Sequence, residues 1–172
     1  MNPVRVKICG LTRPEDVLEA VEAGADAVGM VFAQSPRRVS AEQATRLLEV
    51  VPRDVLRVGL FMNHGRRETR EILEVVSLDL MQFHGPVGNE WCHSFGLPYI
   101  KAVSVDSDRA VQEAKRYPDA AGILFDSPAP GGGGGTGRTF DWSLLRRIDQ
   151  PLWLAGGLNP DNVARADELV NP

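Results

Sequence analysis

A cysteine and an aspartate, far apart in the chain, each stand where proton transfer could occur. Cys9 closes the alternating stretch 4–9, and Lys7 lies on the same face because side chains two residues apart on a strand point the same way. A nearby ammonium favours the thiolate, which is the form of cysteine that reacts as a base or nucleophile. The competing interpretation is that Cys9 is a small buried apolar residue, as free cysteines often are.

Asp126 directly follows the apolar stretch 121–125. A partly buried carboxyl group tends to keep its proton and can then act as a general acid. Capping of the following loop is an equally compatible role for such an aspartate. From its position alone, Asp126 is therefore either an acid catalyst or a turn residue.

Glycines and arginines suggest where an anionic ligand would bind. Gly156 and Gly157 stand between an apolar stretch and a helix start, which is a typical phosphate-binding arrangement of free amides and a helix dipole. Arg37 could clamp a carboxylate through two hydrogen bonds, and Arg38 is the competing candidate. The glycine-rich stretch 130–137 is interpreted as a mobile active-site loop, with a plain linker as the alternative.

The composition indicates a globular protein with neither a nucleic-acid nor a membrane partner. The 172 residues carry 19 Lys and Arg against 23 Asp and Glu, a net charge of -4, with no basic block. Two isolated cysteines, no export signal and no apolar run near the ~20 residues that span a bilayer predict a cytoplasmic protein. Three scattered histidines make no metal site. Whether the protein is a monomer or a homodimer is left open.

Strand and helix patterns alternate along the whole chain, which predicts a parallel α/β sheet because parallel strands need crossover helices. We expect strands over residues 4–9, 26–32, 56–61, 78–83, 99–105, 121–125 and 152–154. We expect helices over residues 14–23, 41–51, 67–76, 89–95, 108–116, 142–148 and 160–170. The N-caps expected from the sequence are Thr12, Ser40 in a capping box with Gln43, Asp106 or Ser107, and Asn159.

Two layouts fit this alternation, a doubly wound open sheet and a (β/α)8 TIM barrel. Polar or glycine-rich segments follow most of the strands, which favours the barrel, because a doubly wound sheet carries function only at its switch-point loops. Seven strand–helix units are visible, whereas a barrel has eight. We therefore expect one barrel domain over residues 1–172 that is incomplete at its C-terminus.

Six short motifs occur in order and together resemble the phosphoribosylanthranilate isomerases of tryptophan biosynthesis. They are Lys7–Thr12, Ser35–Arg37, Val58–Asn63, Gln82–Gly85, Asp126 with Gly135–Gly137 and Phe140–Trp142, and Leu154–Pro160. The resemblance covers the chain from Val4 to Pro172. It implies a (β/α)8 barrel and an Amadori rearrangement that needs neither metal nor cofactor.

The resemblance also implies roles for individual residues toward a phosphorylated small-molecule substrate. Asp126 would protonate the furanose oxygen, and Cys9 would take the C2' proton as a thiolate. Arg37 would hold the anthranilate carboxylate, and Gly156 with Gly157 would form part of the phosphate site. The further substrate-binding residues are Lys7, Gln82 and His84, and the flexible loop is Gly135, Thr136 and Gly137.

The family continues past Pro172 into an eighth strand that completes the phosphate site. We therefore expect the 172-residue chain alone to be unstable or inactive and its functional parent to be longer. A truncated or decayed barrel that binds phosphate ligands or a partner without catalysis is the non-enzyme alternative. A histidine-pathway Amadori isomerase would carry an aspartate in place of Cys9. An indole-glycerol-phosphate synthase would need a longer N-terminus and a catalytic lysine that Lys7 does not supply.

Overall fold

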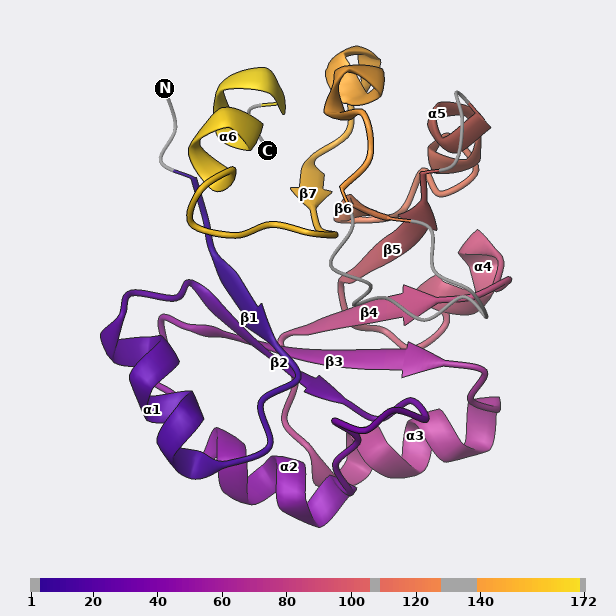
Figure 1. The fold of residues 1–172 in the computed structure, drawn as a ribbon. Helices are drawn as coiled ribbons and strands as arrows, with labels where there is room; N and C mark the ends of the chain where they lie inside the picture. Colours follow the sequence, from indigo (N-terminus) through magenta and orange to yellow (C-terminus); the bar gives the residue numbers. More distant parts are fainter. Residues whose placement is uncertain (1–3, 106–108, 128–138, 171–172) are drawn as a thin grey trace. The chain divides into compact units, whose positions relative to one another are not determined.

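The computed structural model describes residues 4–105, 109–127 and 139–170, which fall into two compact units. The first unit contains the described residues up to 83 together with 95–98. The second contains residues 84–94 and the described chain from 99 onward. Strands and helices alternate in both units (Figure 1), as the sequence predicts. No helix among the described residues is long and apolar enough to cross a membrane.

The first unit is a parallel sheet with its strands in chain order. Its elements are β1 (Lys7–Cys9), α1 (Pro14–Glu22), β2 (Ala27–Val31), α2 (Ala41–Leu48), β3 (Leu56–Met62), α3 (Arg66–Val75) and β4 (Leu80–His84). Only the last residue of β4 belongs to the second unit. The helices α1, α2 and α3 lie along one side of β1, β2 and β3 (Figure 1).

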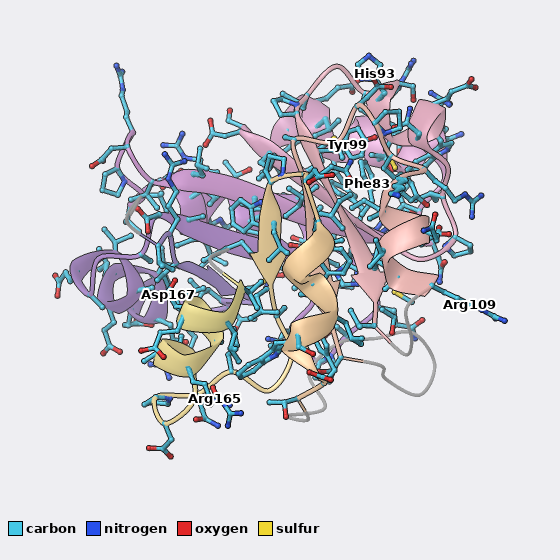
Figure 2. The ribbon with its side chains drawn as sticks, turned by 90° about the horizontal axis from the view of Figure 1, so that it is seen from above. Phe83, His93, Tyr99, Arg109, Arg165 and Asp167 are labelled. Atoms are coloured by element: carbon cyan, nitrogen blue, oxygen red, sulfur yellow. The ribbon has the colours of Figure 1, made fainter. Side chains whose placement is uncertain are left out.

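The strand register separates the side chains of the first unit into two faces. Lys7 is level with Ala27 and Cys9 with Gly29, so these four residues share one face. The opposite face carries further apolar side chains, most of them buried. Among them, the ring of Phe61 lies 5.2 Å from that of Phe32 and 5.8 Å from that of Phe83, which is labelled in Figure 2. Lys7 and Cys9 therefore share their face with buried apolar residues such as Ala27 and Val58.

Two helix starts in the first unit show how local sequence decides a cap. The capping box before α2 is confirmed, with the Gln43 N–H donating to Ser40 Oγ and the Ser40 N–H donating to Gln43 Oε1. The expected Thr12 cap of α1 is wrong, because Arg13 takes that position. Pro14 is the first helical residue, and a proline forces the residue before it into extended backbone, which is the N-cap conformation.

The second unit is also parallel, with the strand order β5-β6-β7. Its elements are α4 (Asn89–His93), β5 (Tyr99–Ser104), α5 (Arg109–Ala114), β6 (Gly122–Asp126), the 3-10 helix η2 (Trp142–Arg147), β7 (Leu152–Leu154) and α6 (Val163–Val170). The helix expected from residue 160 begins later, at Val163, because a turn occupies 160–162. Asn159 caps that turn, since its Oδ1 accepts from the Asp161 N–H at 2.9 Å.

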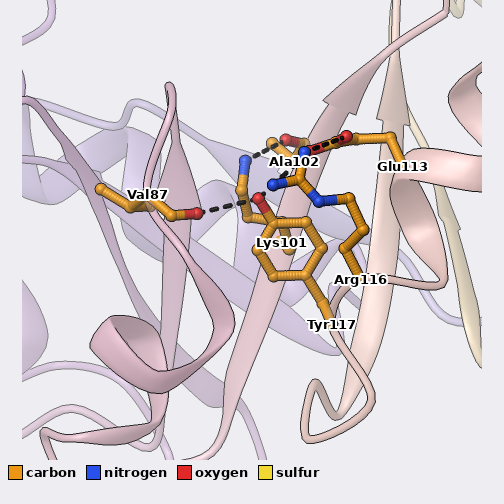
Figure 3. Close-up of polar contacts among 6 residues, drawn as sticks. All are labelled: Val87, Lys101, Ala102, Glu113, Arg116 and Tyr117. Atoms are coloured by element: carbon orange, nitrogen blue, oxygen red, sulfur yellow. Dashed lines mark hydrogen bonds and ion pairs between the residues drawn. The ribbon is translucent and has the colours of Figure 1, made fainter.

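A buried lysine lies in the core of the second unit. Lys101 on β5 is 4% exposed, its ammonium donates to the Ala102 carbonyl at 2.7 Å, and it lies 5.2 Å from the ring centre of Tyr117 (Figure 3). Burial lowers the pKa of Lys101 and raises the pKa of the buried Cys92 thiol to about 11. Because Ser104 is the residue level with Asp126, Lys101 lies on the face opposite to Asp126 and belongs to the core.

Candidate active site

The β1 strand places Lys7 and Cys9 as the sequence predicts. Cys9 is a free, partly buried cysteine at the last position of the strand. Beside it, on β2, lies Gly29, where an added Cβ would lie 2.7 Å from Cys9 Sγ. The thiol therefore occupies the space that a side chain at Gly29 would fill.

Lys7 contacts Gln82, and both residues are expected substrate ligands. The Lys7 ammonium donates to Gln82 Oε1, and Gln82 is a polar residue of β4 that is only 3% exposed. An amide oxygen carries no net charge, so this contact holds the ammonium in place without neutralising it. The positive charge of Lys7 is thus positioned on the Cys9 side of the sheet.

The loop after β2 brings an arginine to the end of β1. The Arg37 N–H donates to Ser35 Oγ at 3.1 Å and the Arg38 N–H to the Ser35 carbonyl at 3.0 Å, so the loop is a tight turn. From this turn Arg37 Nη1 donates to the Cys9 carbonyl at 3.1 Å. Of the two candidate arginines, the structure therefore brings Arg37 to Cys9.

In the second unit, the predicted acid and the predicted phosphate-binding glycines are neighbours. Asp126 ends β6, and its Oδ1 accepts from the Ser127 N–H at 2.8 Å. A Cβ added to Gly156 would lie 2.8 Å from Asp126 Oδ1 and 2.6 Å from the Ser127 nitrogen. Gly156 also has a φ of +88°, which L side chains rarely adopt. The carboxylate and the glycine turn can therefore act on adjacent parts of one ligand.

The turn that contains Gly157 is held by Asn162, which the sequence analysis did not single out. Asn162 Nδ2 donates to the Gly157 carbonyl at 2.9 Å, and Asn162 Oδ1 accepts from the Asn159 N–H at 2.8 Å. Ser127, almost fully buried beside Asp126, was also missed. The sequence could have pointed to both, because Asn162 lies close to Asn159 and Ser127 directly follows Asp126.

Cys9, His84 and Asp126 end strands, and the other candidates outside strands lie in the loops that follow them, where parallel α/β folds present their chemistry. Lys7 instead begins β1, and Gln82 lies within β4. In the first unit the structure brings together Lys7, Cys9, Arg37 and Gln82, and in the second Asp126, Gly156 and Gly157. His84 ends β4 and is partly exposed.

The loop residues Gly135, Thr136 and Gly137 lie outside the described residues. Within the described ranges, no group of three or more His, Cys, Asp or Glu could hold a metal ion.

Comparison with known proteins gives the family. The model of N-(5'-phosphoribosyl)anthranilate (PRA) isomerase matches residues 6–172, which include nearly all of both units. The chain belongs to this family. The enzyme of that name from Pseudomonas aeruginosa strain LESB58 is 52% identical over 175 residues, which cover 100% of this chain and 83% of the relative.

Solved structures agree with this assignment. The crystal structure of phosphoribosyl anthranilate isomerase from Thermotoga maritima matches with a TM-score of 0.89 and 43% identity, over 99% of this chain and 85% of that chain. A second isomerase structure, a complex with reduced 1-(o-carboxyphenylamino)-1-deoxyribulose 5-phosphate, matches with a TM-score of 0.85 and 40% identity, over 99% of this chain and 84% of that chain.

The family and fold expected from the sequence are thereby confirmed. The chain has the α/β fold of the (β/α)8 barrel isomerases, with seven strands in its described residues. It is an isomerase of tryptophan biosynthesis that converts N-(5-phosphoribosyl)anthranilate into 1-(2-carboxyphenylamino)-1-deoxyribulose 5-phosphate. The roles of its individual residues stay predictions.

Proposed function

We propose that Cys9 is the general base and Asp126 the general acid of this isomerisation. The observation that carries the proposal is shared by the two residues. Each ends a parallel strand, and each places its reactive atom beside a glycine, Gly29 for the Cys9 thiol and Gly156 for the Asp126 carboxylate. A glycine leaves room for a ligand atom or a reacting group to approach closely.

The proposed reaction begins with Asp126 in its protonated form. Asp126 gives its proton to the furanose ring oxygen, the C1'–O bond breaks, and a protonated Schiff base forms between C1' and the anthranilate nitrogen. The Cys9 thiolate then takes the proton from C2', and the C2'–H electron pair forms the C1'=C2' double bond of an enolamine. Protonation at C1' with loss of the enol proton yields the ketone. The acid must start protonated and the base deprotonated, so two different residue types suit the two tasks.

The remaining candidates bind the two anionic ends of the substrate. Arg37 holds the anthranilate carboxylate, because a guanidinium matches a carboxylate with paired hydrogen bonds. Gly156 and Gly157 form part of the phosphate site at the turn that precedes α6. Lys7, held by Gln82 with its charge retained, attracts the anionic substrate to the Cys9 side, and His84 completes the set of ligands.

The test measures the loss of substrate fluorescence over time with the unsubstituted protein and with the Cys9→Ala and Asp126→Asn variants. Each variant should lower kcat by about 1000-fold or more while the fold is kept, as is typical when a residue that transfers protons is removed. Cys92→Ala is the matched control, because Cys92 is the other free cysteine and lies buried on α4. It should keep kcat within about threefold of the parent value. Activity in Cys9→Ala similar to that of Cys92→Ala would refute the role of Cys9.

We also propose that the enzyme acts in the cytoplasm, on a free small molecule. Both cysteines are free thiols, which suits a reducing compartment. Fractionation of cells that produce the tagged protein should place it with a cytoplasmic marker enzyme. Recovery with a periplasmic or membrane marker would contradict this location.

A further inference from the structure

The Arg37 side chain lies against Gly10, the residue that directly follows β1. A Cβ added to Gly10 would lie 2.8 Å from Arg37 Nη1, 2.9 Å from Cδ and 3.0 Å from Cζ. Gly10 has a φ of +83°, and its N–H donates to the Gly29 carbonyl at 2.8 Å. The end of the arginine therefore rests where every other residue type would place a side chain.

This position fixes one edge of the guanidinium and leaves donors for a ligand. A guanidinium has five N–H donors, and the described residues accept a hydrogen bond from one nitrogen, Nη1, through the Cys9 carbonyl. Arg37 is thus held against the main chain of the residue that carries the proposed base. The side chain of an arginine is long and has many rotatable bonds. Because this contact already restricts them, Arg37 loses less conformational entropy when it binds a ligand.

We propose that Gly10 is a positioning residue, which seats the Arg37 guanidinium on the Cys9 carbonyl and so orients it toward the substrate carboxylate. This inference rests on the carboxylate-binding role proposed for Arg37. The atoms that conflict with a Cβ at position 10 belong to the mobile end of Arg37 rather than to the backbone. We therefore expect Gly10→Ala to fold, with some backbone strain from the positive φ, and to displace the arginine.

Gly24 provides a matched control within the same unit. It also has a strongly positive φ, +89°, but a Cβ added there would meet nothing within 4 Å. Gly10→Ala and Gly24→Ala thus introduce the same kind of backbone strain, and only the first disturbs a side chain. An effect on KM that is specific to Gly10→Ala, and that disappears when Arg37 is also replaced, comes from the position of Arg37.

The experiment compares KM, kcat and urea midpoints for Gly10→Ala, Gly24→Ala, Arg37→Met and the Gly10→Ala/Arg37→Met double variant, with phosphoribosylanthranilate as substrate. Gly10→Ala should raise KM by about 10- to 100-fold with a smaller change in kcat, as expected for a misplaced binding group. Gly24→Ala should leave KM unchanged. The double variant should have the KM of Arg37→Met alone, because the two changes remove the same interaction.

If Arg37→Met raises KM, and so shows that Arg37 binds substrate, two results would overturn the proposal. One is an unchanged KM in Gly10→Ala, and the other is a double variant in which the two KM effects multiply. If Arg37→Met itself leaves KM unchanged, the substrate-binding role of Arg37 fails instead. Whether Gly10 positions the Arg37 side chain is then judged from the urea midpoints. A urea midpoint that falls in Gly10→Ala and recovers in the double variant supports the positioning of Arg37 by Gly10. An equal fall in the midpoint with and without Arg37 overturns it.

Discussion

At the scale of single residues, the candidate site depends on three glycines, whose lack of a side chain leaves room for functional groups. Gly29 leaves room for the Cys9 thiol, Gly10 for the Arg37 guanidinium, and Gly156 for the Asp126 carboxylate. In each case a Cβ would lie 2.8 Å or less from the functional atom. A side chain placed at that distance must shift one of the two groups. Because catalysis depends on geometry to within about 1 Å, substitution of each of these glycines should lower activity. At Gly10 and Gly156, where φ is positive, substitution should also strain the backbone and lower stability.

The cleanest of these tests is Gly29→Ala, because the backbone of Gly29 has no positive φ to strain. The added Cβ would displace Cys9 Sγ, so we expect kcat to fall by about 100-fold with a smaller change in KM. Steady-state kinetics would measure both constants. Gly88→Ala is the control, since a Cβ there meets nothing within 4 Å. An unchanged kcat in Gly29→Ala would show that the position of the thiol does not limit the reaction.

At the scale of elements, the helix starts are decided by a few local hydrogen bonds. Before α2, the Gln43 N–H lies 3.1 Å from Ser40 Oγ and the Ser40 N–H lies 2.9 Å from Gln43 Oε1. The Ser40 hydroxyl also donates to Glu42, and this hydrogen bond is the main cause of the lowered pKa of that carboxylate. The serine therefore serves both the backbone and an acidic side chain of the first turn.

Replacement of Ser40 by alanine removes the N-cap acceptor and the Glu42 contact together. We expect Ser40→Ala to lower the free energy of unfolding by about 1 kcal/mol, the usual cost of losing an N-cap. Urea unfolding would measure the loss, with the exposed Ser77→Ala as the control. Since Ser40 lies outside the candidate site, kcat should be unchanged. Equal stabilities of the two variants would mean that the capping box adds nothing in solution.

The packing of β5 against Tyr117 gives a prediction on pH. Desolvation lowers the pKa of Lys101 from 10.5, so the unfolded chain binds the lysine proton more tightly than the folded chain does. The penalty for burying the charge is fully present below the folded pKa. It is relieved as the pH rises toward 10.5, so the contribution of Lys101 to stability increases with pH.

The measurement is the free energy of unfolding of the parent minus that of Lys101→Met, at pH 8 and at pH 10.5. We expect this difference to become more positive at the higher pH. Both chains should carry Cys92→Ala, because burial raises the pKa of that thiol to about 11 and its contribution falls over the same range. The exposed Lys115→Met is the control for replacing a lysine by methionine. A flat difference for Lys101 would show that its charge is compensated in the folded protein.

At the scale of the whole molecule, the sequence was sufficient for the fold class and the family. Alternation of apolar strands with amphipathic helices has few stable solutions, and parallel strands joined by helices are one of them. The capping box at Ser40 was predicted because it depends on residues only three positions apart. The range 152–154 for β7 was predicted from its short apolar run, although the strand itself is completed by pairing with β6. The start of α6 was not, since a turn capped by Asn159 competes with the first turn of the helix there.

The sequence by itself determined which residue types could carry the chemistry and in which loops they lie. Residue types alone left Arg37 and Arg38 open, and only the family resemblance favoured Arg37. The sequence also did not pair Lys7 with Gln82, because such choices depend on contacts between segments far apart in the chain. The tertiary structure decided them by bringing strand ends together within each unit. It also shows that functional groups occupy the space where a Cβ of Gly10, Gly29 or Gly156 would lie. A sequence records which side chains are present, whereas the space that a missing side chain leaves exists only once the chain has folded.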